Sequence, residues 1–172
     1  MSRPTKRLAA LLLASLTLVL AGVAGFAQKN FLFTTPARPE VTVKLAAVVE
    51  RDSKLLPLDK SIVIVPGEIL DWTVNAENGG NGAAVDFKTV CHVPPGTEFV
   101  AGSAKAAGAR AVFSIDGGKS YSPQPMIKEK QPDGSTKLVP APVAMYTGLR
   151  YEWTEPLAPG GKLSASYKVR VK

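Results

Sequence analysis

The fold of this chain is decided by the stretch Leu70-Asp71-Trp72-Thr73-Val74-Asn75-Ala76-Glu77, in which apolar and polar residues alternate without a break. Successive side chains of a β-strand point to opposite faces of its sheet. The stretch is therefore predicted to be a strand with one face packed on a core and the other face toward water.

The same kind of pattern continues on both sides of this strand. Alternating or β-branched runs cover residues 41–50, 62–65, 85–90, 97–100, 109–115, 127–130, 135–139, 149–154 and 162–172. No segment after Phe26 keeps a helical period for more than two turns. A series of about seven to nine short strands predicts an all-β chain, and we expect an immunoglobulin-like β-sandwich over residues 40–172.

Turn residues separate the predicted strands. Asn78-Gly79-Gly80-Asn81-Gly82 follows the quoted stretch directly, and glycine and asparagine tolerate a positive φ, so we expect the chain to turn there. A phosphate-binding loop would require a strand–loop–helix context and usually a Lys-Ser/Thr pair, neither of which is present. Asp116-Gly117-Gly118 and Gln131-Pro132-Asp133-Gly134 are predicted to be the turns of two further hairpins.

The N-terminus has the layout of a secretory signal peptide. Arg3, Lys6 and Arg7 precede an apolar run from Leu8 to Phe26 that ends in small residues. We expect residues 1–27 to form a signal helix that is cleaved before Gln28, with a second cleavage site after Ala24. An uncleaved anchor remains the alternative, because the apolar run is almost long enough to span a bilayer.

Composition narrows the function classes. Removing residues 1–27 removes three basic and no acidic residues, which lowers the formal charge from +7 to +4. The remaining charge is spread thinly, whereas nucleic-acid binding usually needs a clustered basic face, so we expect no nucleic-acid partner. The chain has one His and one Cys, so it cannot form a disulfide framework or most His and thiolate metal centres within a single chain. We expect no metal and no cofactor.

The body carries turn-and-strand motifs in a defined order. They are Pro66-Gly67-Glu68, Trp72-Thr73-Val74, Glu77-Asn78-Gly79-Gly80, Val93-Pro94-Pro95-Gly96-Thr97-Glu98-Phe99-Val100, Phe113-Ser114-Ile115-Asp116-Gly117-Gly118-Lys119-Ser120-Tyr121, Leu149-Arg150-Tyr151-Glu152-Trp153 and Pro156-Leu157-Ala158-Pro159-Gly160. Over residues 41–172 this order resembles the bacterial and archaeal surface-repeat family labelled domain of unknown function number eleven. The resemblance implies an immunoglobulin-like module of a secreted or surface-attached protein, with no established enzymatic activity and no catalytic residues.

The chain departs from that family in two respects. The family usually places an Asp where Cys91 stands, so the carboxylate that would cap the following loop is absent. The chain also carries a single copy and no recognisable surface-anchoring tail, so we do not expect a long multi-repeat adhesin.

Cys91 and His92 are the only thiol and the only imidazole of the chain. A Cys–His catalytic pair needs its side chains within hydrogen-bond reach, but neighbours on a strand point to opposite faces. We therefore expect a buried, inert thiol with His92 on the surface.

Three other groups of residues invite a functional interpretation. Asp116 lies in a loop that resembles a calcium loop, but no second acidic ligand accompanies it, so we expect a turn. Two carboxylate pairs, Glu68 with Asp71 and Glu152 with Glu155, have neither the defined separation nor the raised pKa that a glycosidase requires, so we expect surface charge. Trp72, Tyr151, Trp153 and Tyr167 share the apolar faces of strands and are predicted to form the core.

The segment from residue 28 to residue 39 is predicted to be a flexible arm or linker, and we call it the arm. Its apolar residues Phe31, Leu32 and Phe33 are exposed to water in an isolated chain, which favours a partner. Since a sandwich also has unpaired strand edges, the arm is a candidate for pairing with the edge of a neighbour. The simpler interpretation, which the sequence alone favours, is a linker from the membrane or the cleavage site.

The sequence therefore predicts a non-enzymatic module, secreted or in the cell envelope, that acts by binding itself or another envelope protein. One alternative is a subunit of an extracellular filament that assembles by strand addition. A second alternative is a hydrolase accessory that acts on cell-wall or polysaccharide material, for which no residue constellation is present.

Overall fold

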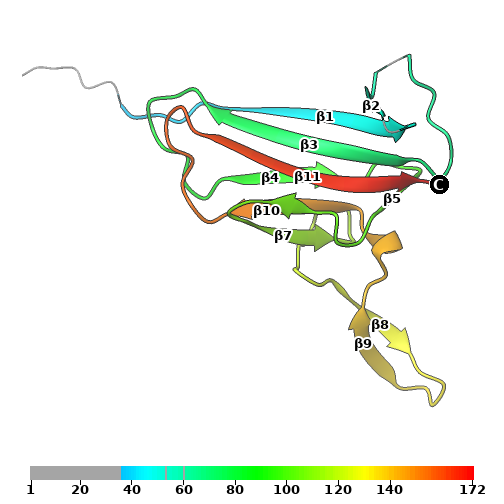
Figure 1. Cartoon of the computed structure of the whole chain (residues 1–172). Helices are drawn as coiled ribbons and strands as arrows, with labels where there is room; N and C mark the ends of the chain where they lie inside the picture. Colours follow the sequence, from blue (N-terminus) through cyan, green and yellow to red (C-terminus); the bar gives the residue numbers. More distant parts are fainter. Residues whose placement is uncertain (1–35, 53, 60) are drawn as a thin grey trace, which may run out of the picture. The chain divides into compact units, whose positions relative to one another are not determined.

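The stretch with unbroken alternation forms β3 (Ile69–Asn78), which lies in the middle of a large antiparallel sheet. The computed structural model describes residues 36–52, 54–59 and 61–172. The predicted signal segment and the apolar arm residues Phe31, Leu32 and Phe33 lie outside the described residues. Residues from Ala37 to Lys172 form one compact unit, and its strands are drawn in Figure 1.

The described residues contain eleven strands and no α-helix, which confirms the predicted all-β class. The strands are β1 (Val41–Arg51), β2 (Lys54–Pro57), β3, β4 (Lys88–His92), β5 (Thr97–Phe99), β6 (Lys105–Ala106), β7 (Ala109–Ser114), β8 (Met126–Lys130), β9 (Thr136–Pro140), β10 (Gly148–Trp153) and β11 (Lys162–Val171). A single turn of 3₁₀ helix spans Val143–Met145.

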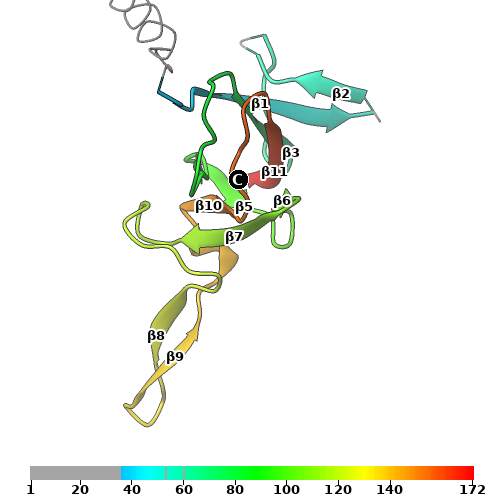
Figure 2. The same ribbon diagram turned by 90° about the vertical axis from the view of Figure 1, so that its left-hand side faces the viewer.

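Two sheets face each other and form the predicted sandwich (Figures 1 and 2). The large sheet has the order β2-β1-β3-β11-β5, with β6 also paired to β11, and the small sheet has the order β4-β10-β7. The predicted hairpin over residues 127–139 is confirmed as β8 and β9, which form a separate two-stranded sheet and extend away from the sandwich (Figure 2).

The strand order differs from the constant-type immunoglobulin order in one exchange. In that order the second strand pairs with the fifth, and the sixth lies between the third and the seventh. The seven principal strands of this chain are, in order, β1, β3, β4, β5, β7, β10 and β11. Here the second strand (β3) pairs with the seventh (β11), and the sixth (β10) lies between the third (β4) and the fifth (β7). The fifth and seventh strands have therefore exchanged sheets within the same architecture.

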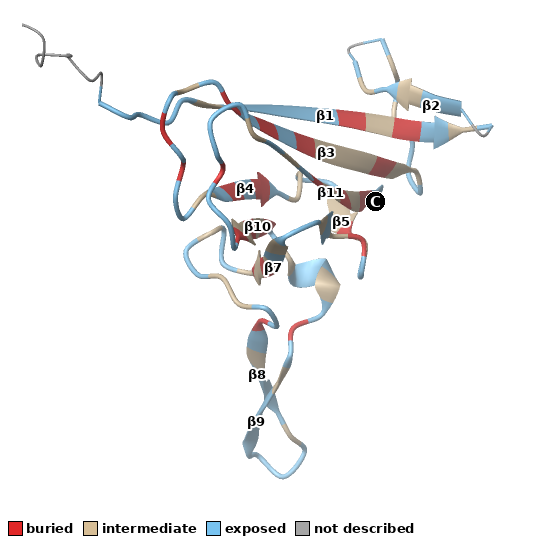
Figure 3. Ribbon diagram, turned by 60° about the vertical axis from the view of Figure 1, so that its left-hand side comes forward, coloured by how far each residue is buried: buried red, intermediate tan, exposed pale blue. Residues whose placement is uncertain are grey.

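The core lies between the facing surfaces of the two sheets, where the buried residues gather (Figure 3). Two tyrosines cross it in opposite directions. The hydroxyl of Tyr151 on β10 donates to the carbonyl of Ser166 on β11 at 2.7 Å, and the hydroxyl of Tyr167 on β11 donates to the carbonyl of His92 on β4 at 2.9 Å. Each ring fills the core while its polar end is satisfied on the opposite sheet, so the two residues join the layers.

Two predicted strands are corrected by the structure. Residues 62–65 form no strand, because Ile62 and Ile64 pack against the core while Val63 and Val65 stay exposed beside no pairing strand. The predicted strand over residues 85–90 begins only at Lys88, because Asp86 adopts a φ of 50° in a turn. Strands β2 and β6 were not predicted.

Candidate binding site at an open side of the sandwich

Among the described strands, two edges on one side of the sandwich have no pairing strand. Strand β2 covers β1 only from Ala47 onward, where the Leu58 N–H donates to the Ala47 carbonyl. Within the described ranges, the first part of β1 therefore has β3 as its single neighbour. Of the strands that the structure describes, only β10 pairs with β4, which forms an edge of the small sheet. Each sheet therefore has an edge that is free to accept another strand.

The register shows which backbone groups these edges present. In an antiparallel pair, residues that exchange hydrogen bonds alternate with residues whose N–H and C=O point away. The bond from Gly79 N–H to Glu40 C=O fixes this phase for β1, so Val43 and Leu45 point their backbone groups away from β3. The bond from Val93 N–H to Thr147 C=O does the same for β4, so Lys88 and Val90 point theirs away from β10.

A cavity of about 230 Å³ lies between the two edges, and we call it the mouth. Its lining is mostly apolar and comes from both sheets: Val43, Leu45, Val74, Lys88, Thr89, Val90 and Cys91. Val43 and Leu45 continue the inward-facing series of Ala47 and Val49, yet they are 49% and 54% exposed. The core is therefore left uncovered at this side of the sandwich.

A buried hydroxyl without a partner lies in the wall of the mouth. Thr89 is 5% exposed, and its Oγ1 makes no hydrogen bond to any described residue. A buried polar group that lacks a partner costs about 1–3 kcal/mol, and native structures contain few of them. This hydroxyl is available to a donor or acceptor brought by a ligand.

Cys91 lies beside Thr89 in the same wall, and its thiol is buried and free, as predicted. Burial raises the pKa of the thiol from its ordinary value to about 11, so only a small fraction is thiolate near neutral pH. His92, the next residue of β4, is exposed on the opposite face. The predicted separation of the two side chains is confirmed, and the structure forms no Cys–His pair.

The segment of residues 38–40, just before β1, contacts the loop of residues 78–82. Asn78 is fully buried, and its Oδ1 accepts from the N–H groups of Glu40 and Gly80, while its Nδ2 donates to the carbonyls of Gly82 and Leu157. The N–H of Arg38 donates to Asn81 Oδ1. All four hydrogen-bonding positions of the Asn78 amide are used, and residues 38–40 are held in line with β1.

The predicted turn over residues 78–82 is present, but the predicted reason for its glycines is wrong. Gly79, Gly80 and Gly82 do not adopt a positive φ. A Cβ on Gly80 would lie 2.3 Å from the Arg38 carbonyl oxygen, and a Cβ on Gly82 would lie 2.8 Å from the Arg38 nitrogen. These two glycines therefore allow the close approach of residues 37–40 to the loop.

Three of the four carboxylates considered as catalytic pairs are engaged in ion pairs. Hydrogen bonds from the Arg51 side chain, followed by one from the Val65 N–H, lower the pKa of Glu68. Asp71 pairs with Lys168 at 3.0 Å, and Glu155 is exposed.

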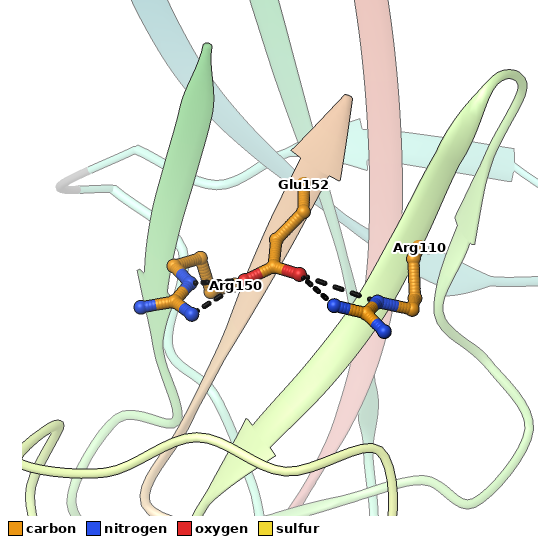
Figure 4. Close-up of polar contacts among 3 residues, drawn as sticks. All are labelled: Arg110, Arg150 and Glu152. Carbon is orange, nitrogen blue, oxygen red and sulfur yellow. Dashed lines mark hydrogen bonds and ion pairs between the residues drawn. The ribbon is translucent and has the colours of Figure 1, made fainter. Parts of the chain in front are cut away.

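Glu152 lies on the outer face of the small sheet between two arginines, as Figure 4 shows. Hydrogen bonds from Arg110 and then from Arg150 lower the pKa of Glu152. The guanidinium of Arg150 also lies over the ring of Tyr121, 4.4 Å from its centroid. A carboxyl that acts as a general acid near neutral pH requires a raised pKa, whereas the pKa of Glu152 is lowered.

Asp116 forms the predicted turn. Its Oδ2 accepts from the Ser120 hydroxyl, and its Oδ1 accepts from the Ser120 N–H and the Ser114 hydroxyl, which together hold the pKa of Asp116 far below its usual range. Gly117 and Gly118 both have a positive φ, and a bridge between Phe113 and Ser122 closes the loop. Within the described part of the chain, no three His, Cys, Asp or Glu side chains gather as a metal site.

The four aromatic residues predicted for the core do contribute to it. Tyr151, Tyr167 and Trp153 are buried, and the half-buried Trp72 stacks on Tyr167 with the ring centroids 6.4 Å apart. Neither indole N–H has an acceptor in the described chain.

A larger concavity of about 510 Å³ lies on the outer face of the large sheet, at the ends of β1, β3 and β11. Its lining combines exposed polar side chains, including Lys44 and Asn75, and the ammonium of Lys162 pairs with Glu77 at 3.1 Å. In contrast to the mouth, this surface is lined by strands of one sheet, and none of its lining residues carries a buried polar atom without a partner.

Comparison of the chain with known protein families, with curated proteins and with solved structures gave no match. The described residues contain no helix of the length and hydrophobicity needed to cross a membrane.

Sequence reasoning did not find the mouth. The alternation places Val43 and Leu45 on the inward face of their strand, but alternation cannot show whether another strand covers that face. The sheet order and the unpaired hydroxyl of Thr89 are the signals that identify the mouth, and both require the structure.

Proposed function

We propose that this protein is an exported or cell-envelope module without enzymatic activity, and that it binds an extended protein segment by strand addition at the mouth. The observation that carries the proposal is the coincidence of two unpaired strand edges with an uncovered apolar wall. An added strand satisfies the edge groups of Val43, Leu45 or Val90 through its backbone and covers the wall with its side chains.

Three features support an extended protein segment over other ligands. An edge of a strand recognises a backbone, which every extended peptide offers. Lys88 is the single charged residue that lines the mouth, which favours an occupant with few charges. The partly exposed side chains of Val43 and Leu45 provide contacts for apolar side chains at alternate positions of the added strand.

Export is supported by the N-terminal sequence, where a basic segment, an apolar run and small residues follow one another. The resemblance to secreted and surface-attached modules supports the same location. The carboxylates do not support a hydrolase function, because Glu68 and Glu152 are held in ion pairs that lower their pKa.

Selection of peptides tests the proposal. We expect a displayed library of random nine-residue peptides, selected on the purified compact unit of residues 37–172, to yield sequences with alternating apolar residues. Leu45→Glu places a charge in the mouth, and it is expected to weaken binding of the selected peptides by about tenfold or more, since burial of a leucine is worth about 1.5–3 kcal/mol. Fluorescence anisotropy of the labelled peptides measures the change.

Leu138→Glu provides the matched control. Leu138 is an exposed leucine on β9, 60% accessible compared with 54% for Leu45, but it lies outside the mouth. Binding should be unchanged in this variant. Equal binding to all three proteins, or a library that yields no binder to the unaltered chain, would contradict the proposed function.

A further inference from the structure

We propose that the segment which fills the mouth is the arm of a second copy of this chain, with residues 28–35 as the added strand and Phe31 and Phe33 as its anchors. This inference rests on the proposed function and names its partner. It also predicts the kind of assembly that results.

The arm has the properties that the mouth selects. Residues 30–35 are Asn-Phe-Leu-Phe-Thr-Thr, which carry no charge and place Phe31 and Phe33 on the same side of an extended strand. An eight-residue strand spans about 26 Å, enough to run the full length of the five-residue strand β4. Its hydroxyl and amide side chains offer partners for the unpaired Thr89 Oγ1.

The direction of the chain favours a second copy over the same copy. Residues 38–40 are held to the loop of residues 78–82 by the side chains of Asn78 and Asn81, and Gly80 and Gly82 allow this close contact. They continue the line of β1 beyond its first residue, as Figure 1 shows. To enter the mouth of its own copy, the chain would have to reverse its direction immediately before this fixed segment.

Two other surface features support no comparable proposal. The ion pairs of Glu152 with Arg110 and Arg150 satisfy one another on an exposed sheet face. The hairpin of β8 and β9 exposes Met126 and Leu138, but nothing in the structure shows what covers them. The mouth is distinguished by an apolar wall, two free edges and an unpartnered buried hydroxyl at one place.

An arm that binds the mouth of the next copy makes a head-to-tail interface. The donating surface differs from the accepting surface, so each copy that accepts an arm still offers its own arm. Such a contact produces open chains unless the rotation between copies closes a ring. We therefore expect the purified chain of residues 28–172 to form concentration-dependent oligomers, either open chains or closed rings.

Two complementary variants test this interface. The first carries Phe31→Ser and Phe33→Ser, so its mouth is intact and its arm is disabled. The second carries Leu45→Glu, so its arm is intact and its mouth is disabled. Each variant alone is expected to be monomeric in sedimentation velocity, while an equimolar mixture should form a one-to-one complex that grows no further. Leu138→Glu should assemble like the unaltered chain, and thermal melts establish that every variant is folded.

The outcomes separate this inference from the proposed function. A monomeric unaltered chain, or a mixture of the two variants that forms no complex, would overturn the arm as the occupant. Association that persists in either variant alone would also overturn it, because such a contact would need neither the arm nor the mouth. If library peptides still bind the mouth in any of these cases, the proposed function stands and only the identity of the partner is wrong.

Discussion

Replacement of Asn78 by alanine is expected to lower the free energy of unfolding by about 3–5 kcal/mol. The amide of Asn78 is fully buried and holds two backbone N–H groups and two backbone carbonyls from three separate segments. Each buried group left without its partner costs about 1–3 kcal/mol, and alanine provides neither a donor nor an acceptor. Urea unfolding followed by tryptophan fluorescence measures the difference.

Asn75→Ala is the control for this change. Asn75 lies on the same strand, but its side chain is exposed and makes no hydrogen bond within the described chain. The expected effect is within about 0.5 kcal/mol, as for most surface substitutions. Similar losses for the two variants would show that residues 38–40 and the loop of residues 78–82 are not joined through Asn78.

Replacement of Tyr151 by alanine is expected to cost about 3–5 kcal/mol as well, for a different reason. Its ring is fully buried at the centre of the core, and its removal leaves a cavity between the two sheets. Burial also raises the pKa of the Tyr151 hydroxyl far above its ordinary value, so the residue stays neutral throughout the physiological range. Thermal and urea unfolding both report the loss.

Tyr151→Phe divides this effect into its two parts. Phenylalanine keeps the ring but loses the hydrogen bond to the Ser166 carbonyl, so we expect a loss of about 1 kcal/mol. A phenylalanine variant as unstable as the alanine variant would show that the hydrogen bond between the sheets, and not the packing of the ring, provides most of the stability.

The sequence predicts the elements whose pattern is local. The alternation of Leu70, Trp72 and Val74 identifies β3. The two glycines of Asp116-Gly117-Gly118 predict a turn, and both adopt the positive φ that such a turn requires. Cys91 and His92 were placed on opposite faces by the two-residue period alone.

The features that sequence reasoning missed depend on long-range pairing. Residues 62–65 have the composition of a strand, but no neighbouring strand pairs with them. The glycines of the loop over residues 78–82 are required by a segment about forty positions earlier in the chain, and not by their own φ angles. The mouth exists because β2 stops short of the first half of β1 and β4 has a single neighbour, which only the sheet order reveals.

Amide hydrogen exchange tests strand addition at the mouth most directly. The acceptor is the purified Phe31→Ser, Phe33→Ser variant, and a synthetic peptide of residues 28–36 is the added strand. The N–H groups of Val43 and Leu45 on β1, and of Lys88 and Val90 on β4, point away from their neighbouring strands. We expect the peptide to slow exchange by about tenfold or more at alternate residues of one of these edges, because an added strand gives those groups hydrogen-bond partners. Unchanged exchange at both edges with saturating peptide, or protection confined to β7 on the other side of the small sheet, would contradict the account.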